Sequence, residues 1–402
     1  MKFIHMADVH IGGWREHALS QLSVDAFTHI IDKSLSESVD FVIIAGDLFN
    51  TALPAIEYMK EIVVQLKRLA DSAIPVYIIP GSHDYSPSGK TMISVLEKAG
   101  LVVNVARATQ KTKETIQLEL TQDSKTKAYL TGIMGKRNML DTAFYKSLDT
   151  ENLKVDGFKI FLFHTALDEL KPESMTKMES APVSLLPSGF DYYAGGHVHI
   201  VAHRNLPGYK NVIYPGPVFP NSFAELEKLR CGSYYLYDNG IITLQKIKLK
   251  EIVVLTINCT DKTPEQISHD MHNLLETTNV TDAIVLIRLS GKLKTGRLAD
   301  IGLSAFITKI NEKGAYAVLK NISSVITPEF EELKKNFSAQ SIEDAVIDEH
   351  IGQTPIDNLS HEDEKSLIVN LLSHLSIEKQ EGETNTTYEE RVCSGVNFIE
   401  KS

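Results

Sequence analysis

The sequence contains few cysteines and no long apolar run. Its three cysteines, Cys231, Cys259 and Cys393, are odd in number and far apart in a chain of 402 residues. This spacing fits neither a disulfide framework nor a CxxC zinc site. No stretch approaches the roughly 18 to 20 apolar residues that a membrane-spanning helix needs, and residues 1–8 do not have the pattern of a secretory signal. We therefore expect a soluble protein of the cytoplasm, a reducing compartment, with no membrane association.

The chain also lacks the basic excess that is typical of nucleic-acid-binding proteins. It has 41 Lys+Arg and 52 Asp+Glu, which gives a net charge of -11. The region 328–402 alone contains 17 acidic and 6 basic residues, so it accounts for the whole of this charge. The remaining body is neutral, and a neutral body that holds divalent cations can accept a polyanion locally. The composition therefore does not exclude DNA as a substrate.

Apolar runs and helix-length amphipathic segments alternate in the first part of the chain. Runs that end in polar residues predict strands at 2–7, 41–45 and 76–79, and the segments between them predict helices at 23–36 and 54–70. This alternation is typical of an α/β fold with right-handed crossovers. Further strands are expected at 127–133, 158–163, 191–195 and 233–237, the last before a hairpin turn at 238–240.

The chain divides by pattern into three regions, 1–250, 251–327 and 328–402. The second is a small βαβαβ module with Thr263 as the expected N-cap of its first helix. Its strands are expected at 252–257, 283–289 and 315–319, and its helices at 264–276 and 300–310. The third region is acidic and polar. Its one amphipathic helix is marked by the i, i+3, i+4, i+7 spacing of Ile368, Leu371, Leu372 and Leu375, and disorder is expected beyond it.

Five short polar clusters each follow a predicted strand of the first region. They are Asp8-Val9-His10, Gly46-Asp47, Gly81-Ser82-His83-Asp84, His164 and Gly196-His197-Val198-His199. Each cluster alone has an ordinary explanation, since Gly-Asp is a common turn and a single histidine is usually packed or solvated. Together they share one position, the carboxyl ends of strands, where open α/β sheets bind their ligands. The set therefore indicates one site.

The mixture of carboxylates and imidazoles in these clusters predicts a metal centre. Such ligands suit borderline divalent ions such as manganese, iron or zinc. A carboxylate that bridges two ions holds them roughly 3.5 to 4 Å apart, a spacing that clamps a phosphoryl oxygen and activates water. We therefore expect a two-metal phosphoesterase.

The order of the clusters resembles the calcineurin-like metallophosphoesterases over roughly residues 1–250. This resemblance implies an αββα sandwich of two sheets in which Asp47 bridges two metals. It also implies that one metal is completed by Asp8, His10 and His199, and the other by Ser82, His164 and His197. His83 would then be the catalytic histidine near the substrate, and Asp84 would hold its ring in orientation.

Ser82 departs from the pattern of that family, which has asparagine at this position. A serine hydroxyl is shorter and is a weaker oxygen donor than an amide carbonyl, so we expect the second metal to be held less firmly. This departure is also the one feature that favours a third reading of the chain, a scaffold that has lost a metal and its activity.

Several features resemble the Mre-eleven/SbcD-type double-strand-break nucleases within this family. They are Asp84 in place of glutamate, the motif Asp8-Val9-His10-Ile11-Gly12, and Tyr214-Pro215-Gly216-Pro217 followed by Ser222-Phe223 and acidic residues. The small α/β module resembles the capping domain of these proteins. The resemblance implies a manganese-dependent DNA exonuclease and endonuclease that processes broken ends. The competing reading is a different metallophosphoesterase that acts on small nucleotides.

The same resemblance implies partners. A homodimer would form through helices near 56–66 and 92–96, although core packing explains their apolar spacing equally well. The helix at 368–375 would bind a Rad-fifty/SbcC-type ATPase, or else pack on its own body. Trp14 and Arg15 are candidates for contact with a DNA strand.

Overall fold

A computed structural model describes residues 1–85, 91–136, 142–172, 175, 178–327, 347, 360–377, 388 and 391. The chain forms two compact units, Met1–Ile252 and Val253–Ser402. No helix among the described residues is long and apolar enough to cross a membrane.

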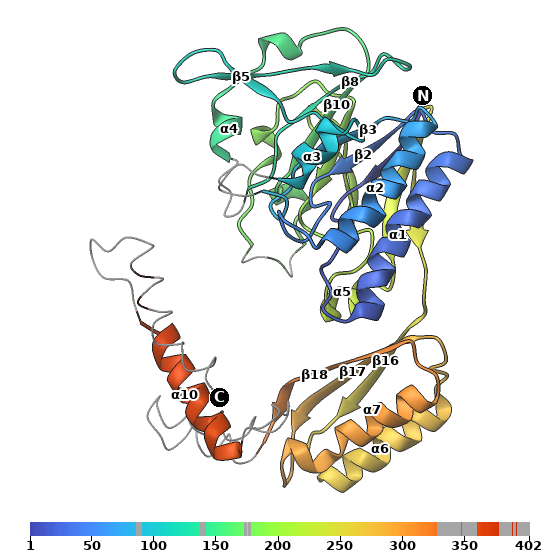
Figure 1. The fold of residues 1–402 in the computed structure, drawn as a ribbon, viewed down its shortest axis with the longest axis vertical. Helices are drawn as coiled ribbons and strands as arrows, with labels where there is room; N and C mark the ends of the chain where they lie inside the picture. Colours follow the sequence, from blue (N-terminus) through green and yellow to red (C-terminus); the bar gives the residue numbers. More distant parts are fainter. Residues whose placement is uncertain are drawn as a thin grey trace. The chain divides into compact units, whose positions relative to one another are not determined.

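The first unit contains a six-stranded sheet with the order β15-β14-β1-β2-β3-β4. The strands are β1 (Lys2–Met6), β2 (Phe41–Ala45), β3 (Val76–Ile79), β4 (Val103–Asn104), β14 (Gly232–Asp238) and β15 (Ile241–Ile247). Neighbours from β1 to β4 are parallel, and β14 and β15 extend the sheet antiparallel. The long helices α1 (His17–Ser36) and α2 (Ile56–Asp71) lie side by side along this sheet, with α3 (Met92–Lys98) beside them (Figure 1).

A second six-stranded sheet of the same unit has the order β12-β13-β11-β10-β8-β7. Its strands are β7 (Thr121–Gln122), β8 (Tyr129–Gly132), β10 (Lys159–His164), β11 (Tyr192–Gly196), β12 (Val201–Leu206) and β13 (Tyr209–Pro215). A smaller sheet pairs β5 (Ala108–Gln110), β6 (Ile116–Leu118) and β9 (Leu148–Asp149). The short helices here are α4 (Thr142–Lys146), α5 (Phe223–Leu229) and the 3₁₀ turns at Glu151–Leu153, Asp168–Leu170 and Val183–Leu185.

The two large sheets pack face to face through one apolar core. Phe41 and Ile43 of β2 meet Ile160, Leu162 and Tyr192 of the opposite sheet in a single buried cluster. Strand β2 is buried at every residue because its alternate side chains face either this core or the helices. A second cluster, which includes Phe161 and Tyr193, fills the space under the short helices. The layers are therefore α, β, β, α, as predicted, and the second helical layer is made of short helices.

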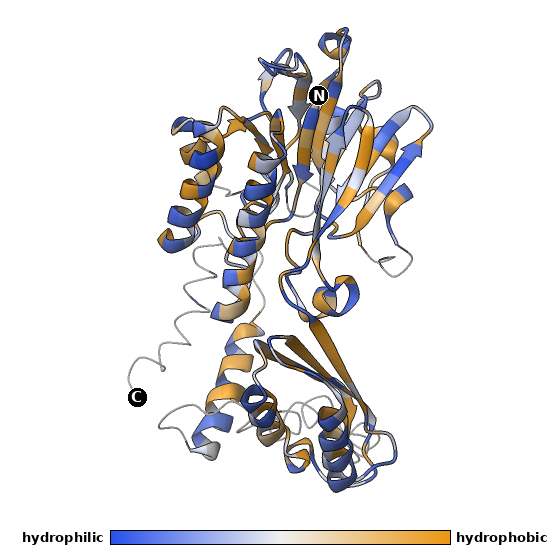
Figure 2. Ribbon diagram, turned by 90° about the vertical axis from the view of Figure 1, so that its right-hand side faces the viewer, coloured by the Kyte–Doolittle hydropathy of each residue, from blue (hydrophilic) through white to orange (hydrophobic). Residues whose placement is uncertain are grey.

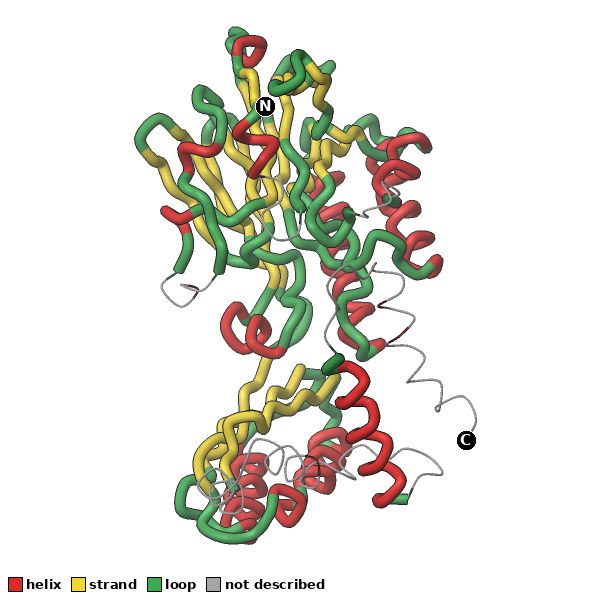
Figure 3. The backbone as a smooth tube through the Cα atoms, turned by 90° about the vertical axis from the view of Figure 1, so that its left-hand side faces the viewer, coloured by secondary structure: helices red, strands yellow, loops and turns green. Residues whose placement is uncertain are grey.

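The second unit has a three-stranded sheet backed by two helices. The sheet order is β16-β17-β18, from β16 (Ile252–Asn258), β17 (Ile284–Lys292) and β18 (Ala317–Ile326), and β17 and β18 are parallel. Both α6 (Pro264–Thr277) and α7 (Leu303–Glu312) lie on one face of this sheet (Figures 1 and 3). Figure 2 shows the apolar residues of these helices alternating with polar ones, and Phe306 and Met271 belong to the buried core. Thr263 caps α6 through a capping box, as expected.

The amphipathic segment of the acidic region forms α10 (His361–Leu375), which begins after the N-cap Ser360. Val369, Leu372 and Leu375 on this helix are exposed to 39%, 46% and 63%. The disorder predicted beyond Leu375 falls on residues that lie mostly outside the described part of the chain.

Candidate metal centre

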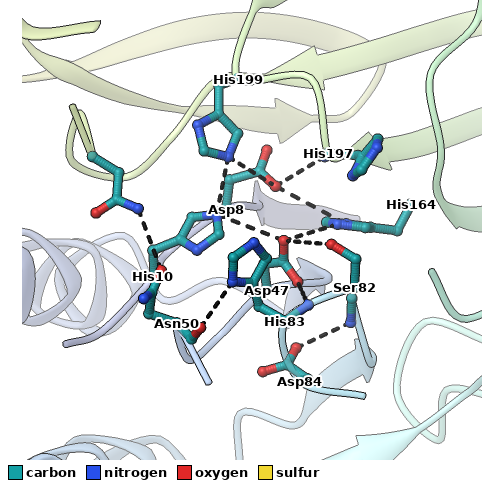
Figure 4. A network of polar contacts seen from close by, with 12 residues as sticks. Asp8, His10, Asp47, Asn50, Ser82, His83, Asp84, His164, His197 and His199 are labelled. Carbon is teal, nitrogen blue, oxygen red and sulfur yellow. Dashed lines mark hydrogen bonds and ion pairs between the residues drawn. The ribbon is translucent and has the colours of Figure 1, made fainter. Parts of the chain in front are cut away.

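The five polar clusters converge at one edge of the sandwich. Strands β1, β2 and β3 are adjacent and parallel, so the loops that follow them leave the first sheet on the same side. Strands β10 and β11 are adjacent and parallel in the second sheet. Figure 4 shows the side chains from both sets of loops around Asp47. A Cβ atom on Gly46 would lie 2.2 Å from His164 Nδ1, so glycine is required where the two sheets meet.

Three groups of potential ligand atoms lie within 4.8 Å of one another. The first is Asp8, His10 and His199, the second is His10, Asp47 and His83, and the third is Asp8, Asp47 and His164. The groups share Asp8, His10 and Asp47, so they form one continuous centre. All but His83 and His199 are buried.

The distances within this centre fit divalent ions. His10 Nε2 and His199 Nε2 are 2.9 Å apart. Two nitrogens that each lie about 2.1 Å from one ion, at a right angle, are about 3.0 Å apart. Asp47 Oδ2 lies 3.6 Å from His10 Nε2 on one side and 3.1 Å from His164 Nε2 on the other. One carboxylate oxygen between two imidazoles is the arrangement that a bridging ligand needs.

Two of the predicted ligands contribute differently from the rest. The Ser82 hydroxyl is buried and donates to Asp47 Oδ2 at 3.4 Å, so its oxygen lies at the centre. Among the described residues, the three ligand groups do not include His197. The ring of His197 packs edge-on against His164 with centroids 5.1 Å apart, and its main-chain N–H donates to Asp8 Oδ1 at 2.9 Å.

The expected contact between Asp84 and the His83 ring is replaced by another. His83 Nδ1 lies 2.8 Å from the main-chain oxygen of Asn50. Both oxygens of Asp84 accept main-chain N–H groups, from Leu48, Phe49 and Gly81, at 3.0 to 3.1 Å. Only the contact with Gly81 is local, while Leu48 and Phe49 belong to the loop that follows β2, so Asp84 joins the loops after β2 and β3. Asp84 therefore fixes the backbone that carries His83, while Asn50 orients the ring.

Burial lowers the pKa of the histidines in this centre, and the neighbouring carboxylates raise it. Burial lowers the pKa of His164, but Asp47 and Asp8 outweigh it and raise this pKa to about 10. Burial likewise lowers the pKa of His199, but Asp8 and Glu225 raise it to about 9. Burial prevails at His10, where it lowers the pKa to about 3. Without bound ions, the centre therefore contains two imidazolium groups beside carboxylates.

The backbone is strained at most of the predicted ligands. Positive φ angles occur at Asp8 (52°), His10 (47°), Asp47 (53°), His197 (101°) and His199 (50°). Such conformations cost about 1 to 3 kcal/mol each in non-glycine residues and persist where the surrounding structure enforces them. The strained backbone that positions these side chains therefore lowers the stability of the fold, and such strain is typical of a functional site.

Comparison with known proteins agrees with the geometry of this centre, which fits divalent metal ions. Residues 1–201, half of the chain, match the calcineurin-like phosphoesterase family. The chain belongs to this family. Within it, the chain is similar to archaeal proteins described as DNA double-strand break repair protein Mre11.

The similarity to these relatives is moderate in identity and varied in extent. The Archaeoglobus fulgidus protein is 29% identical over 239 residues, which cover 57% of this chain and 52% of that protein. The Methanococcus maripaludis protein is 29% identical over 265 residues, with coverage of 62% and 67%. The Sulfolobus acidocaldarius protein is 26% identical over 390 residues, with coverage of 91% and 97%. The chain thus spans about half of the first relative and nearly all of the third.

Some residues of the site were missed in the sequence. Asn50, Asn221 and Glu225 were not foreseen, although Glu225 is among the acidic residues that follow Ser222-Phe223. Trp14, a candidate for contact with a DNA strand, is half-buried, and its indole N–H donates to the main-chain oxygen of Pro220 at 2.9 Å. Trp14 therefore anchors the loop before α5.

Proposed function

We propose that this calcineurin-like phosphoesterase is a DNA nuclease that hydrolyses phosphodiester bonds at double-strand-break ends. The observation that carries this proposal is the convergence of five strand-end clusters around Asp47. The similarity to Mre11 proteins over both units of the chain supports DNA as the substrate.

We assign Asp8, His10 and His199 to one ion, and Ser82, His164 and His197 to the other, with Asp47 shared. Manganese is the metal that the resemblance to the Mre-eleven/SbcD-type nucleases implies, and the mixture of carboxylate oxygen and imidazole nitrogen suits it as it suits iron or zinc. When bound, such a pair of ions polarises the phosphoryl group and activates water.

His83 is the expected general acid of the reaction. A main-chain oxygen only accepts hydrogen bonds, so the contact with Asn50 places a proton on His83 Nδ1 and leaves Nε2 directed away from that contact. In the imidazolium form, Nε2 donates its proton to the leaving sugar oxygen. The main-chain N–H of His83 donates to Asp47 Oδ1 at 2.8 Å, so the backbone that carries the ring is held against the proposed bridging carboxylate.

The proposal extends to domains and partners. The region 251–327 would act as a capping domain that guides DNA, and the exposed apolar side chains of α10 would bind a Rad-fifty/SbcC-type ATPase. A homodimer would form through α2 and α3, where Ile56, Val64 and Val95 are exposed to 65%, 55% and 53%. Apolar side chains at this exposure are suited to burial in an interface. The cytoplasm remains the expected location.

A DNA cleavage assay with manganese tests this function. The wild type should cut a blunt duplex, while His83→Leu and Asp47→Ala should not, and only His83→Leu should still bind two ions. His203→Leu is the matched control, because His203 bonds to Asn211 in the β12–β13 ladder and should be dispensable for cleavage. Cleavage of a nucleotide analogue but of no DNA would replace the proposal with a small-nucleotide phosphoesterase. Metal binding without any cleavage would favour a scaffold.

A further inference from the structure

The segment before α5 holds one glutamate in a fixed orientation. Ser222 is the N-cap of α5, and its hydroxyl accepts the main-chain N–H of Glu225 at 3.2 Å. Glu225 Oε2 reaches back and accepts the main-chain N–H of Asn221 at 2.8 Å. Two contacts at opposite ends of the residue therefore determine where its carboxylate points. The other oxygen, Oε1, is free to meet a partner outside the helix.

That partner is His199. Glu225 Oε1 lies 3.0 Å from His199 Nδ1, and the two side chains are only 24% and 19% exposed. Because an ionised carboxylate only accepts hydrogen bonds, Nδ1 carries the proton of a neutral His199 ring and Nε2 keeps its lone pair. The same Nε2 faces the centre, 2.9 Å from His10 Nε2 and 3.9 Å from Asp8 Oδ1.

We propose that Glu225 is a positioning residue for the metal centre, which fixes both the tautomer and the ring orientation of His199 without touching the ion. This inference rests on the proposed assignment of His199 as a ligand of the ion that Asp8 and His10 share. Carboxylates that accept from the second nitrogen of a metal-binding histidine commonly have this role.

The same segment also connects to the proposed general acid. Asn221 Nδ2 donates to Asn50 Oδ1 at 3.4 Å, and the main-chain oxygen of Asn50 accepts from His83 Nδ1. Trp14 fixes the segment from the other side through Pro220. A change at Asn221 should therefore lower turnover through His83, while ion binding through Glu225 and His199 remains.

Manganese titration by calorimetry, on protein stripped of metal, tests the role of Glu225. In Glu225→Gln, one of the two ions should bind about 10- to 100-fold more weakly, and the other should bind as in the wild type. Glu227→Gln is the matched control, because it removes the same charge from the same helix at a position that does not face Glu225. Binding of both ions with wild-type affinity by Glu225→Gln would overturn the inference.

A second variant separates this inference from the metal assignment, and a fold control accompanies both. Glutamine keeps an oxygen that can accept from Asn221, so α5 should remain intact, and a melting temperature equal to that of Glu227→Gln would confirm it. His199→Ala should lose the same ion that Glu225→Gln weakens. If His199→Ala binds both ions normally, the assignment of His199 is wrong. If it loses one ion while Glu225→Gln weakens neither, only the positioning role of Glu225 is wrong.

Discussion

Loading the centre with metal should release about two protons near pH 7.5. His164 and His199, with pKa values of about 10 and 9, are both imidazolium groups in the metal-free protein at this pH. A histidine binds a metal only in its neutral form, so each must lose its proton. The cost follows from the distance between each pKa and the pH, and it is about 3 kcal/mol for His164 and about 2 kcal/mol for His199.

Because protons and metal ions compete for the same histidines, the metal affinity should depend on pH. Both pKa values are raised above the ordinary value for histidine, so protons compete with the ions for His164 and His199 at neutral pH. As the pH rises toward 9, the protons leave these rings and the ions bind more easily. The association constant of each ion should therefore rise about tenfold per pH unit between roughly pH 6.5 and 8.5. His10 should add nothing to this slope, because burial keeps it neutral.

Calorimetry in two buffers measures the released protons directly. Manganese is titrated into the metal-free protein at one pH in Tris and in a buffer of low ionisation enthalpy, and the difference in heat gives the proton count. His5→Gln is a suitable control, because His5 is buried, lies outside the centre and has a pKa lowered to about 3 by burial, so it should leave the count at two. Equal heats in both buffers would show that His164 and His199 are neutral before loading, and the electrostatic account of the centre would be wrong.

Three further predictions concern single residues. Ser82→Asn should tighten the binding of the second ion, because an amide oxygen replaces a hydroxyl that now donates to Asp47, and equal affinity in a manganese titration would contradict this. Gly196→Ala should lower the melting temperature strongly, since its Cβ would lie 2.3 Å from the main-chain oxygen of Ala45; an unchanged melting temperature would refute this close approach. His5→Gln should make the free energy of unfolding fall less as the pH is lowered. The pKa of His5 is depressed in the folded state, so its share of stability is present above pH 6.5 and lost as the pH falls toward 3. Between pH 7 and 5, urea unfolding of the metal-free variant should lose about 2 kcal/mol less than the wild type, and an equal loss would contradict this.

The sequence predicts the strands of the first sheet well, for a physical reason. Strands β1, β2 and β3 are largely buried, mostly apolar runs, and an aspartate or a proline stands within two residues after each of them, so their limits were predicted to within one residue. The start of α1 was missed by six residues. His17 and Gln21 give that turn a polar appearance, although Leu19 and Leu22 within it are fully buried.

In the site, too, the local sequence predicts some features, while contacts between distant parts of the chain determine the others. That Asp8 and Asp47 would meet was predictable, because each follows a strand and the parallel strands β1 and β2 end at one edge of the same sheet. His164 is the last residue of β10 in the other sheet, so its place beside them depends on how the two sheets pack. The left-handed backbone at Asp8 and Asp47 was not, because neither residue is a glycine and it occurs where the main chains after β1 and β2 bond to each other, through Asp8 N–H to Gly46 O and Val9 N–H to Asp47 O. The link from Glu225 to His199 joins residues 26 positions apart, and no periodic pattern marks such a pair.

Crystals grown with manganese and measured at its absorption edge test the central claim most directly. The account predicts two anomalous peaks roughly 3.5 to 4 Å apart on either side of the Asp47 carboxylate, with both occupancies falling in Asp47→Ala. A single peak, or two peaks that do not share Asp47, would contradict the two-metal centre.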